Sequence, residues 1–208
     1  MLILSLDCAG SGCGVCLWKD GQILAQTEES MDRGQDRRLI PLVNDTMQNA
    51  KLDFADLDRI AVTRGPGSFT GLRIGLAAAR GIGFAAGKPV IGIDRFEIYR
   101  RAVQSPDLLV VINSRRQELY CRFYPQSDTA GEPGMMTEKQ ITEFLADKKD
   151  AVTAGDVPGI PRFQAAMDKE TALAAILASK ADPKDPTYLP RPLYIRPPDV
   201  TFPKNKSA

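Results

Sequence analysis

Residues 59–93 read RIAVTRGPGSFTGLRIGLAAARGIGFAAGKPVIGI, and this stretch decides the fold. A short apolar run leads into a glycine-rich loop, a long segment with helical apolar spacing follows, and a second apolar run closes the stretch. Gly87 and Pro89 mark the end of the helical segment. The order strand, helix, strand predicts two parallel strands with a helix packed on their sheet. The expected elements are a strand at Arg59–Thr63, a loop at Gly65–Gly71, a helix at Leu72–Ala86 and a strand at Val90–Ile93.

The segment before this stretch predicts a three-stranded antiparallel meander. Leu2–Asp7 is an apolar run that ends in an acid, and a second run extends to Trp18 after a glycine-rich turn. The pair Asp20-Gly21 favours a type I′ hairpin turn, after which residues 23–27 continue as a strand. The meander and the parallel strands together make a mixed sheet.

The remaining apolar spacing predicts helices and a second, smaller sheet. Asp36 is the expected N-cap of a helix that runs to Ala50, although Pro41 leaves open a start nearer residues 39–40. A further helix runs from Asp94 to about Gln104. In the second half we expect strands at 108–113 and 118–124 and helices at 137–146 and 171–180.

This pattern indicates an α/β protein with two lobes. We expect an N-terminal lobe of residues 1–104 and a smaller C-terminal lobe of residues 105–208. From Pro183 onward there are seven prolines in 21 residues, so this tail is expected to be extended, tied onto the surface or partly disordered.

Composition excludes several function classes. Lys and Arg number 27 against 26 for Asp and Glu, so the whole chain lacks the basic excess with which a protein binds long nucleic acid by itself. The sequence contains no histidine, which excludes His-based zinc sites and catalytic triads, and we expect no metal site. No apolar run approaches the roughly 18 residues that span a bilayer, so we expect a cytoplasmic protein. Cys13 and Cys16 should point to opposite faces of a strand, as packing thiols.

Two glycine-rich turns are candidates for phosphate binding. The loop 65–71 leads into a helix N-terminus, where backbone N–H groups attract anions, but it lacks the Gly-Lys-Ser/Thr of a Walker A loop. A tight turn capped by Ser68 or Thr70 is the alternative. Asp7 with Gly10 and Ser11 is similar to the acid and small-residue turn that hold magnesium and phosphate in actin-like ATPases. An aspartate that caps its own turn explains the same residues.

Small residues recur at every fourth position of the second predicted helix. Gly71, Gly75, Ala79 and Gly83 form a thin ridge, although each interior glycine costs the helix roughly 0.5–1 kcal/mol. The ridge must therefore pack closely against another element, which is either this protein's own sheet or a helix of another chain. We predict the second. The first helix is expected to add apolar residues to this interface: Leu39, Leu42, Val43 and Met47.

The eleven residues GPGSFTGLRIG at 65–75 resemble the signature of the TsaB (YeaZ) family. The signature loop consists of Gly65, Pro66, Gly67, Ser68, Phe69, Thr70 and Gly71. Further similarity lies in LSLD at 4–7, LIPL at 39–42, RRQELY at 115–120 and YIRPP at 194–198, so the resemblance covers the whole chain. Two positions depart from the family pattern: Gln35-Asp36 stands where His-Ser is common, and Asn113 stands where aspartate is common.

The resemblance implies a two-lobed actin-like ATPase fold of the ASKHA, ribonuclease H-like class. It implies a homodimer when alone, a heterodimer with the catalytic relative TsaD, and the ATPase TsaE as a further partner. Together these proteins attach a threonylcarbamoyl group to the adenosine 3′ of the anticodon in tRNAs that read codons beginning with adenine. The chain would contact tRNA through the complex and would bind no cofactor alone, with ATP or ADP held at the heterodimer junction.

The sequence thus predicts a non-catalytic binding subunit. The rival from another class is an autonomous actin-like ATPase or phosphotransferase that uses Asp7 for magnesium. A protease is disfavoured because Ser68 has no histidine to act as its base. The basic tail from Lys184 to Lys206 either touches tRNA in the complex or packs back on the body.

Overall fold

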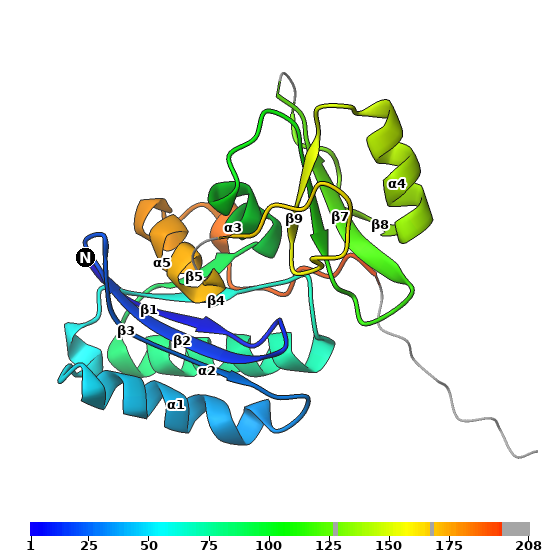
Figure 1. Ribbon diagram of the computed structural model, residues 1–208. Helices are drawn as coiled ribbons and strands as arrows, with labels where there is room; N and C mark the ends of the chain where they lie inside the picture. Colours follow the sequence, from blue (N-terminus) through cyan, green and yellow to red (C-terminus); the bar gives the residue numbers. More distant parts are fainter. Residues whose placement is uncertain (127–128, 167–168, 197–208) are drawn as a thin grey trace, which may run out of the picture.

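The computed structural model describes residues 1–126, 129–166 and 169–196, which form two mixed sheets and five α-helices (Figure 1). The first sheet has the strand order β3-β2-β1-β4-β5. Its strands are β1 (Leu2–Asp7), β2 (Gly12–Lys19), β3 (Gln22–Ser30), β4 (Arg59–Thr63) and β5 (Val90–Ile93). The second sheet has the order β8-β7-β6-β9. Its strands are β6 (Leu108–Ile112), β7 (Glu118–Tyr124), β8 (Gly134–Thr137) and β9 (Val152–Gly155).

The first sheet confirms the expected meander and its parallel additions. β1, β2 and β3 pair antiparallel, while β4 pairs parallel with β1 and β5 parallel with β4. Asp20 and Gly21 both have positive φ, of 47° and 96°, as a type I′ turn requires. The carboxyl ends of the parallel strands β1, β4 and β5 therefore lie at the same end of the sheet, toward the second lobe (Figure 1).

Helices cover both faces of the first sheet. α1 (Gln35–Asn49) and α2 (Phe69–Ala86) pack on one face, where alternate residues of β1 such as Leu4 and Leu6 join their core. α5 (Glu170–Lys180) packs on the other face beside α3 (Arg95–Ala102). α3 also contacts the second sheet through Phe96 and Tyr99, so it is the shared layer between the lobes. α4 (Glu138–Asp147) covers the far face of the second sheet (Figure 1).

The position of α5 corrects the expected division of the chain. Leu173, Ala174 and Ala178 of α5 pack in one core with Ile3 and Ala61 of the first sheet. The chain thus returns to the first lobe after building the second, and a boundary after residue 104 separates the two sheets but not the helices that cover them.

The start of α1 differs from the prediction. Gly34, with φ of 96°, is the N-cap, and Asp36 lies inside the first turn without capping it. The buried Gln35 opens the helix, and its side-chain amide donates to the carbonyl of Met31 over 3.3 Å. Pro41 lies within the helix rather than in its first turn. A glycine with positive φ allows the sharp entry of the chain, which the polar pattern alone did not reveal.

The second half of the chain confirms the predicted strands at 108–113 and 118–124 and both predicted helices to within a residue or two. Thr137 caps α4 in a capping box with Gln140. The four-residue strands β8 and β9 were missed. The tail segment is tied to the first lobe, because Leu193 N donates to Arg64 O over 2.7 Å and the Arg80 guanidinium donates to Pro190 O. Residues 197–208, with the rest of the basic tail, lie outside the described residues.

Within the described ranges, no helix is both long and apolar enough to cross a membrane. Cys13 and Cys16 point to opposite faces of the first sheet, as predicted, and pack in different cores. The Cys13 thiol lies 3.1 Å from that of Cys8 at the end of β1.

Candidate functional site

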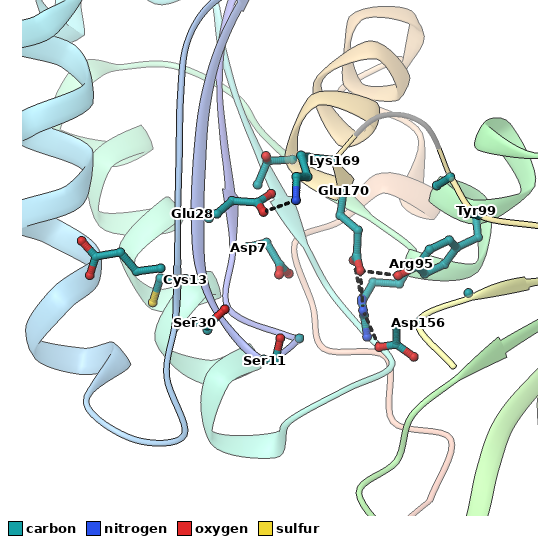
Figure 2. A pocket seen from close by; sticks show the side chains of 18 of the residues that line it. Asp7, Ser11, Cys13, Glu28, Ser30, Arg95, Tyr99, Asp156, Lys169 and Glu170 are labelled. Atoms are coloured by element: carbon teal, nitrogen blue, oxygen red, sulfur yellow. Dashed lines mark hydrogen bonds and ion pairs between the residues drawn. The ribbon is translucent and has the colours of Figure 1, made fainter. Parts of the chain in front are cut away.

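A pocket of about 330 Å³ lies where the two lobes meet, at the carboxyl end of β1 (Figure 2). The turn between β1 and β2 forms one wall, the start of α5 a second, and the residues after β9 a third. The predicted Asp7, Gly10 and Ser11 all line this pocket. The structure therefore brings the three candidate nucleotide-binding residues together in one pocket.

Asp7 is tied to its own turn. Its Oδ1 accepts from Ala9 N over 3.0 Å and also from the Thr63 hydroxyl. Burial, followed by the nearby charge of Glu170, raises the pKa of the Asp7 carboxyl above its ordinary value. The bond from Ala9 N is that of an aspartate that caps its own turn, and the Thr63 hydroxyl on β4 supplies a second bond to the same oxygen.

Beside Asp7 lies a buried ion-pair cluster that the sequence analysis did not find. The Arg95 guanidinium, only 1% exposed, donates twice to Glu170, with both distances 2.6 Å, and once to Asp156 over 3.1 Å. A further guanidinium bond goes to Pro66 O over 3.0 Å, and the Tyr99 hydroxyl donates to Glu170. Figure 2 shows these side chains converging from α3, α5 and the end of β9. The Arg95 charge holds the pKa of Glu170 below its ordinary value despite burial.

One sequence signal could have indicated this cluster. Arg95 stands four residues before Tyr99, on the same side of α3 as an aromatic residue expected in the core. A charge on the buried side of a helix requires a partner, but the partner, Glu170, is 75 residues away along the chain.

The pocket is acidic. Its lining carries five carboxylates against two cationic side chains. The carboxylates are Asp7, Glu28, Glu29, Asp156 and Glu170, and the cations are Arg95 and Lys169. Both cations are already paired, since Lys169 Nζ lies 3.2 Å from Glu28. A polyphosphate entering the pocket would meet an excess of like charge. Over the described part of the chain, His, Cys, Asp and Glu side chains form no group of three that could hold a metal ion.

Two N–H groups of the signature loop, those of Ser68 and Gly71, donate within the protein. Ser68 caps α2, because its hydroxyl accepts from Gly71 N over 3.2 Å, and Ser68 N donates to Ala9 O over 2.9 Å. A Cβ on Gly67 would overlap Ala9 O, and one on Gly71 would overlap Cys8 O. The glycines therefore let the loop press its backbone against the turn that follows Asp7. These contacts match the tight-turn alternative for the loop.

The small-residue ridge packs inward, which contradicts its predicted role as a partner interface. Gly71, Gly75, Ala79 and Gly83 are all buried. The Cβ position of Gly75 lies 3.7 Å from Cys8 and Val62, and that of Gly83 meets Val90. The ridge lets α2 lie close on its own sheet, and the spacing alone did not reveal which side faces inward.

The apolar residues predicted for the same interface are also in the core. Leu39, Leu42 and Val43 are each 1% exposed and Met47 is 2% exposed. They join the cluster that α1 and α2 build against β1 and β2. Any contact of these two helices with a partner must therefore use their outer sides.

Comparisons with known proteins match this chain to a TsaD family model and to proteins named TsaB. Residues 22–135 match the family model TsaD, described as tRNA N6-adenosine threonylcarbamoyltransferase. The chain is 32% identical over 160 residues to the tRNA threonylcarbamoyladenosine biosynthesis protein TsaB of Escherichia coli K12, covering 75% of this chain and 69% of that protein. A shorter match, 48% identical over 65 residues, is to tRNA N6-adenosine threonylcarbamoyltransferase of Erythrobacter litoralis and covers 31% of this chain and 19% of that protein.

A solved structure supports the same fold. A Pseudomonas aeruginosa protein described as similar to peptidase YeaZ superposes with a TM-score of 0.72 and 24% identity, over 94% of this chain and 99% of that one. The mixed sheets and packed helices are those of the actin-like ATPase fold, as the signature residues predicted. The chain belongs to the TsaB (YeaZ) family, whose named members serve tRNA threonylcarbamoyladenosine biosynthesis.

Proposed function

We propose that this chain is a non-catalytic partner subunit of the complex that attaches a threonylcarbamoyl group to the adenosine 3′ of the anticodon. In this proposal it binds the catalytic relative TsaD in the cytoplasm, and TsaE joins the pair. The surface that binds TsaD would also form a homodimer when TsaD is absent. Support comes from the name of the E. coli relative and from the match to the TsaD family model.

The outer side of α2 is the observation that carries this proposal. Phe84 is 92% exposed, which is unusual for a large aromatic side chain. Ala77, Gly81 and Ala85 are exposed at every fourth position beside it, and they form a second small-residue strip on the side away from the sheet. A helix of another chain can approach closely along small residues, with Phe84 as an apolar anchor. On α1, Ile40 is 44% exposed.

The acidic pocket supports the non-catalytic part of the proposal. The two cations of the pocket, Arg95 and Lys169, are paired with acids of this chain. Asp7 Oδ1 already accepts a hydrogen bond from Ala9 N in its own turn. Neither glycine-rich turn carries a lysine that could reach a phosphate. ATP or ADP would then bind where TsaD supplies the missing positive groups. The rival function, an autonomous ATPase or phosphotransferase that uses Asp7 for magnesium, requires this pocket to bind nucleotide without help.

Association with TsaD tests the proposal. Gly81→Leu adds bulk on the outer side of α2, where an added Cβ meets nothing within 4 Å, so the chain should fold normally. Overpacking at an interface costs about 1–3 kcal/mol, which corresponds to a loss of roughly 5- to 150-fold in affinity. Light scattering of the mixed proteins should show a heterodimer with wild type and a weakened one with Gly81→Leu.

The matched control is Lys139→Leu on α4, which adds the same side chain at an exposed position on the other lobe. This variant should associate like wild type. The proposal fails if the wild-type chain and TsaD remain separate. It also fails if Gly81→Leu and Phe84→Asp both associate as tightly as wild type.

A further inference from the structure

Two free thiols face each other at the end of the first hairpin. Cys8 directly follows β1, and Cys13 is the second residue of β2. Asp7 and Gly14 are opposite partners in the β1–β2 ladder, so the next pair outward is Cys8 with Cys13. Their sulfur atoms lie 3.1 Å apart. Cys16 is on the other face of the sheet, so the thiol that meets Cys13 is the one five positions before it and not the one in the Cys-x-x-Cys spacing.

The position of Cys8 opposite Cys13 suits a disulfide. Opposite residues of an antiparallel pair have Cα atoms about 4.5–5.5 Å apart, and disulfides join Cα atoms that are about 4.4–6.8 Å apart. A sulfur–sulfur bond is about 2.05 Å long, so the two sulfur atoms need to approach by only about 1 Å. Both side chains belong to the core that α1 and α2 build on the first sheet, so they point to the same face.

The two thiols differ in reactivity. The hydrogen bond between them lowers the pKa of Cys13 and raises the pKa of Cys8, which burial raises further. Cys13 Sγ also lies 3.9 Å from the carbonyl of Gln35, at the start of α1, where the nearby charge of the half-exposed Arg38 favours a thiolate. Because the thiolate is the nucleophile, Cys13 is the thiol that an oxidant meets first.

The other two cysteines are placed differently. Cys16 and Cys121 are buried in two separate cores, and burial raises the pKa of each to about 12. A thiol with such a pKa is almost wholly protonated near neutral pH and reacts slowly. These two residues are therefore internal controls for the pair Cys8 and Cys13.

We propose that Cys8 and Cys13 form a reversible disulfide when the protein meets a hydroperoxide. The Cys13 thiolate attacks one peroxide oxygen, the O–O bond breaks, and Cys13 becomes a sulfenic acid while the other oxygen leaves as water. The Cys8 sulfur then attacks the Cys13 sulfur, the S–O bond breaks, and a second water leaves with the Cys8 proton. Two thiols are oxidised and one hydrogen peroxide is reduced to two waters. A dithiol reductant reverses the step by exchange.

The bridge would close the turn that forms one wall of the acidic pocket. Gly10 and Ser11, which line the pocket, lie between the two cysteines. The signature loop already holds this turn from the other side, since Ser68 N donates to Ala9 O over 2.9 Å. Oxidation would therefore fix a turn that in the reduced chain is held by hydrogen bonds. The inference goes beyond the partner role and does not depend on it, because both thiols belong to this chain.

Thiol counting by intact mass tests the proposal. The full chain is treated with an equimolar amount of hydrogen peroxide and then labelled with N-ethylmaleimide in denaturant. The reduced chain takes four labels, one for each cysteine, and the oxidised chain should take two, with four restored by dithiothreitol. Cys8→Ser should form no disulfide and should instead hold a sulfenic acid at Cys13, which dimedone traps. Cys13→Ser should keep all its remaining thiols under the same conditions.

Cys16→Ala and Cys121→Ala are the matched controls, and each should form the bridge at the wild-type rate. Trypsin releases residues 1–19 as one peptide with three cysteines, so fragmentation of the wild-type peptide between Cys13 and Cys16 assigns the bridge without any variant. Thermal melts verify that each variant is folded. The urea midpoint of the wild-type chain should rise on oxidation, because the bridge constrains the unfolded chain, and that of Cys8→Ser should not.

Three results would overturn the proposal. The first is four free thiols in the wild-type chain after the peroxide treatment. The second is a bridge that includes Cys16 or Cys121, or one that joins two chains on a non-reducing gel. The third is loss of thiols in Cys8→Ser and Cys13→Ser at the wild-type rate, which would show that the two sulfur atoms do not react as a pair.

Discussion

The Asp94 carboxyl should make the stability of the folded chain depend on pH. Its Oδ1 accepts from Phe96 N over 2.8 Å at the start of α3, and burial raises its pKa from 3.8 to about 6. Between about pH 4 and pH 6 the folded chain therefore holds a proton that the unfolded chain has released. Because the folded state then binds more protons, this carboxyl makes the free energy of unfolding fall as pH rises through that window.

Asp94→Asn should remove this dependence while retaining a capping oxygen. Relative to the variant, wild type should lose up to about 3 kcal/mol of stability between pH 4 and pH 7, since each pKa unit corresponds to about 1.4 kcal/mol. Urea unfolding at several pH values measures the difference. Parallel stability curves for the two proteins would show that Asp94 titrates normally.

The pair Arg95 and Glu170 should be strongly coupled. Glu170→Gln leaves the 1% exposed Arg95 guanidinium with Asp156 as its remaining ion-pair partner among the described residues. We expect a loss of about 3 kcal/mol in the free energy of unfolding. Arg95→Met should cost a similar amount, because it leaves a carboxylate largely buried. The double variant Arg95→Met with Glu170→Leu should recover much of this loss, since no buried charge remains unpaired. A double-mutant cycle by urea unfolding measures the coupling, and additive losses would contradict it.

At the scale of elements, α2 has two small-residue strips with different functions. Gly71→Ala should destabilise the fold by about 1–3 kcal/mol, because the new methyl group would overlap the Cys8 carbonyl. Gly81→Ala is the matched change on the outer strip. It should stabilise the fold by about 0.5–1 kcal/mol, since alanine favours the helix and nothing lies near. Thermal and urea unfolding of both variants checks the pair; equal stability of the two would show that the inner ridge is not closely packed.

Local signals predicted the first sheet because its turns and runs are self-contained. Asp20-Gly21 specifies a hairpin, and Gly87 specifies a helix end, whatever packs around them. The strands β8 and β9 escaped prediction because, unlike the equally short β5, they are not runs of large apolar residues: β8 reads GMMT and is half-buried throughout, and β9 reads VTAG.

The sequence pattern could not predict how the helices and strands pack against one another. The fourfold spacing of Gly71, Gly75 and Ala79 placed them correctly on one side of α2, but spacing does not say which side meets the sheet. The position of the pocket could be predicted from Asp7 and its turn, because binding sites form at the carboxyl ends of parallel strands and Asp7 ends β1. The acidic character of the pocket could not be predicted, because Asp156 and Glu170 come from distant parts of the chain.

At the scale of the whole molecule, α5 makes the lobes interdependent. Residues 1–104 contain the first sheet but lack Ala172, Leu173 and Ala175, which cover one of its faces. A fragment of residues 1–104 should therefore show no cooperative thermal unfolding, because one apolar face of its sheet would be exposed to water. Circular dichroism on heating, with the full chain as control, provides the measurement. A sharp transition in the fragment would show that the first lobe is an independent domain.

The central claim is that the chain supports the modification of tRNA without performing chemistry at Asp7. Threonylcarbamoylation can be reconstituted from tRNA, TsaD, TsaE and the threonylcarbamoyl adenylate, with and without this chain. The account predicts that wild type and Asp7→Asn restore the reaction equally, while Gly81→Leu restores it poorly. Loss of the reaction with Asp7→Asn, in a variant that folds and binds TsaD like wild type, would contradict the account.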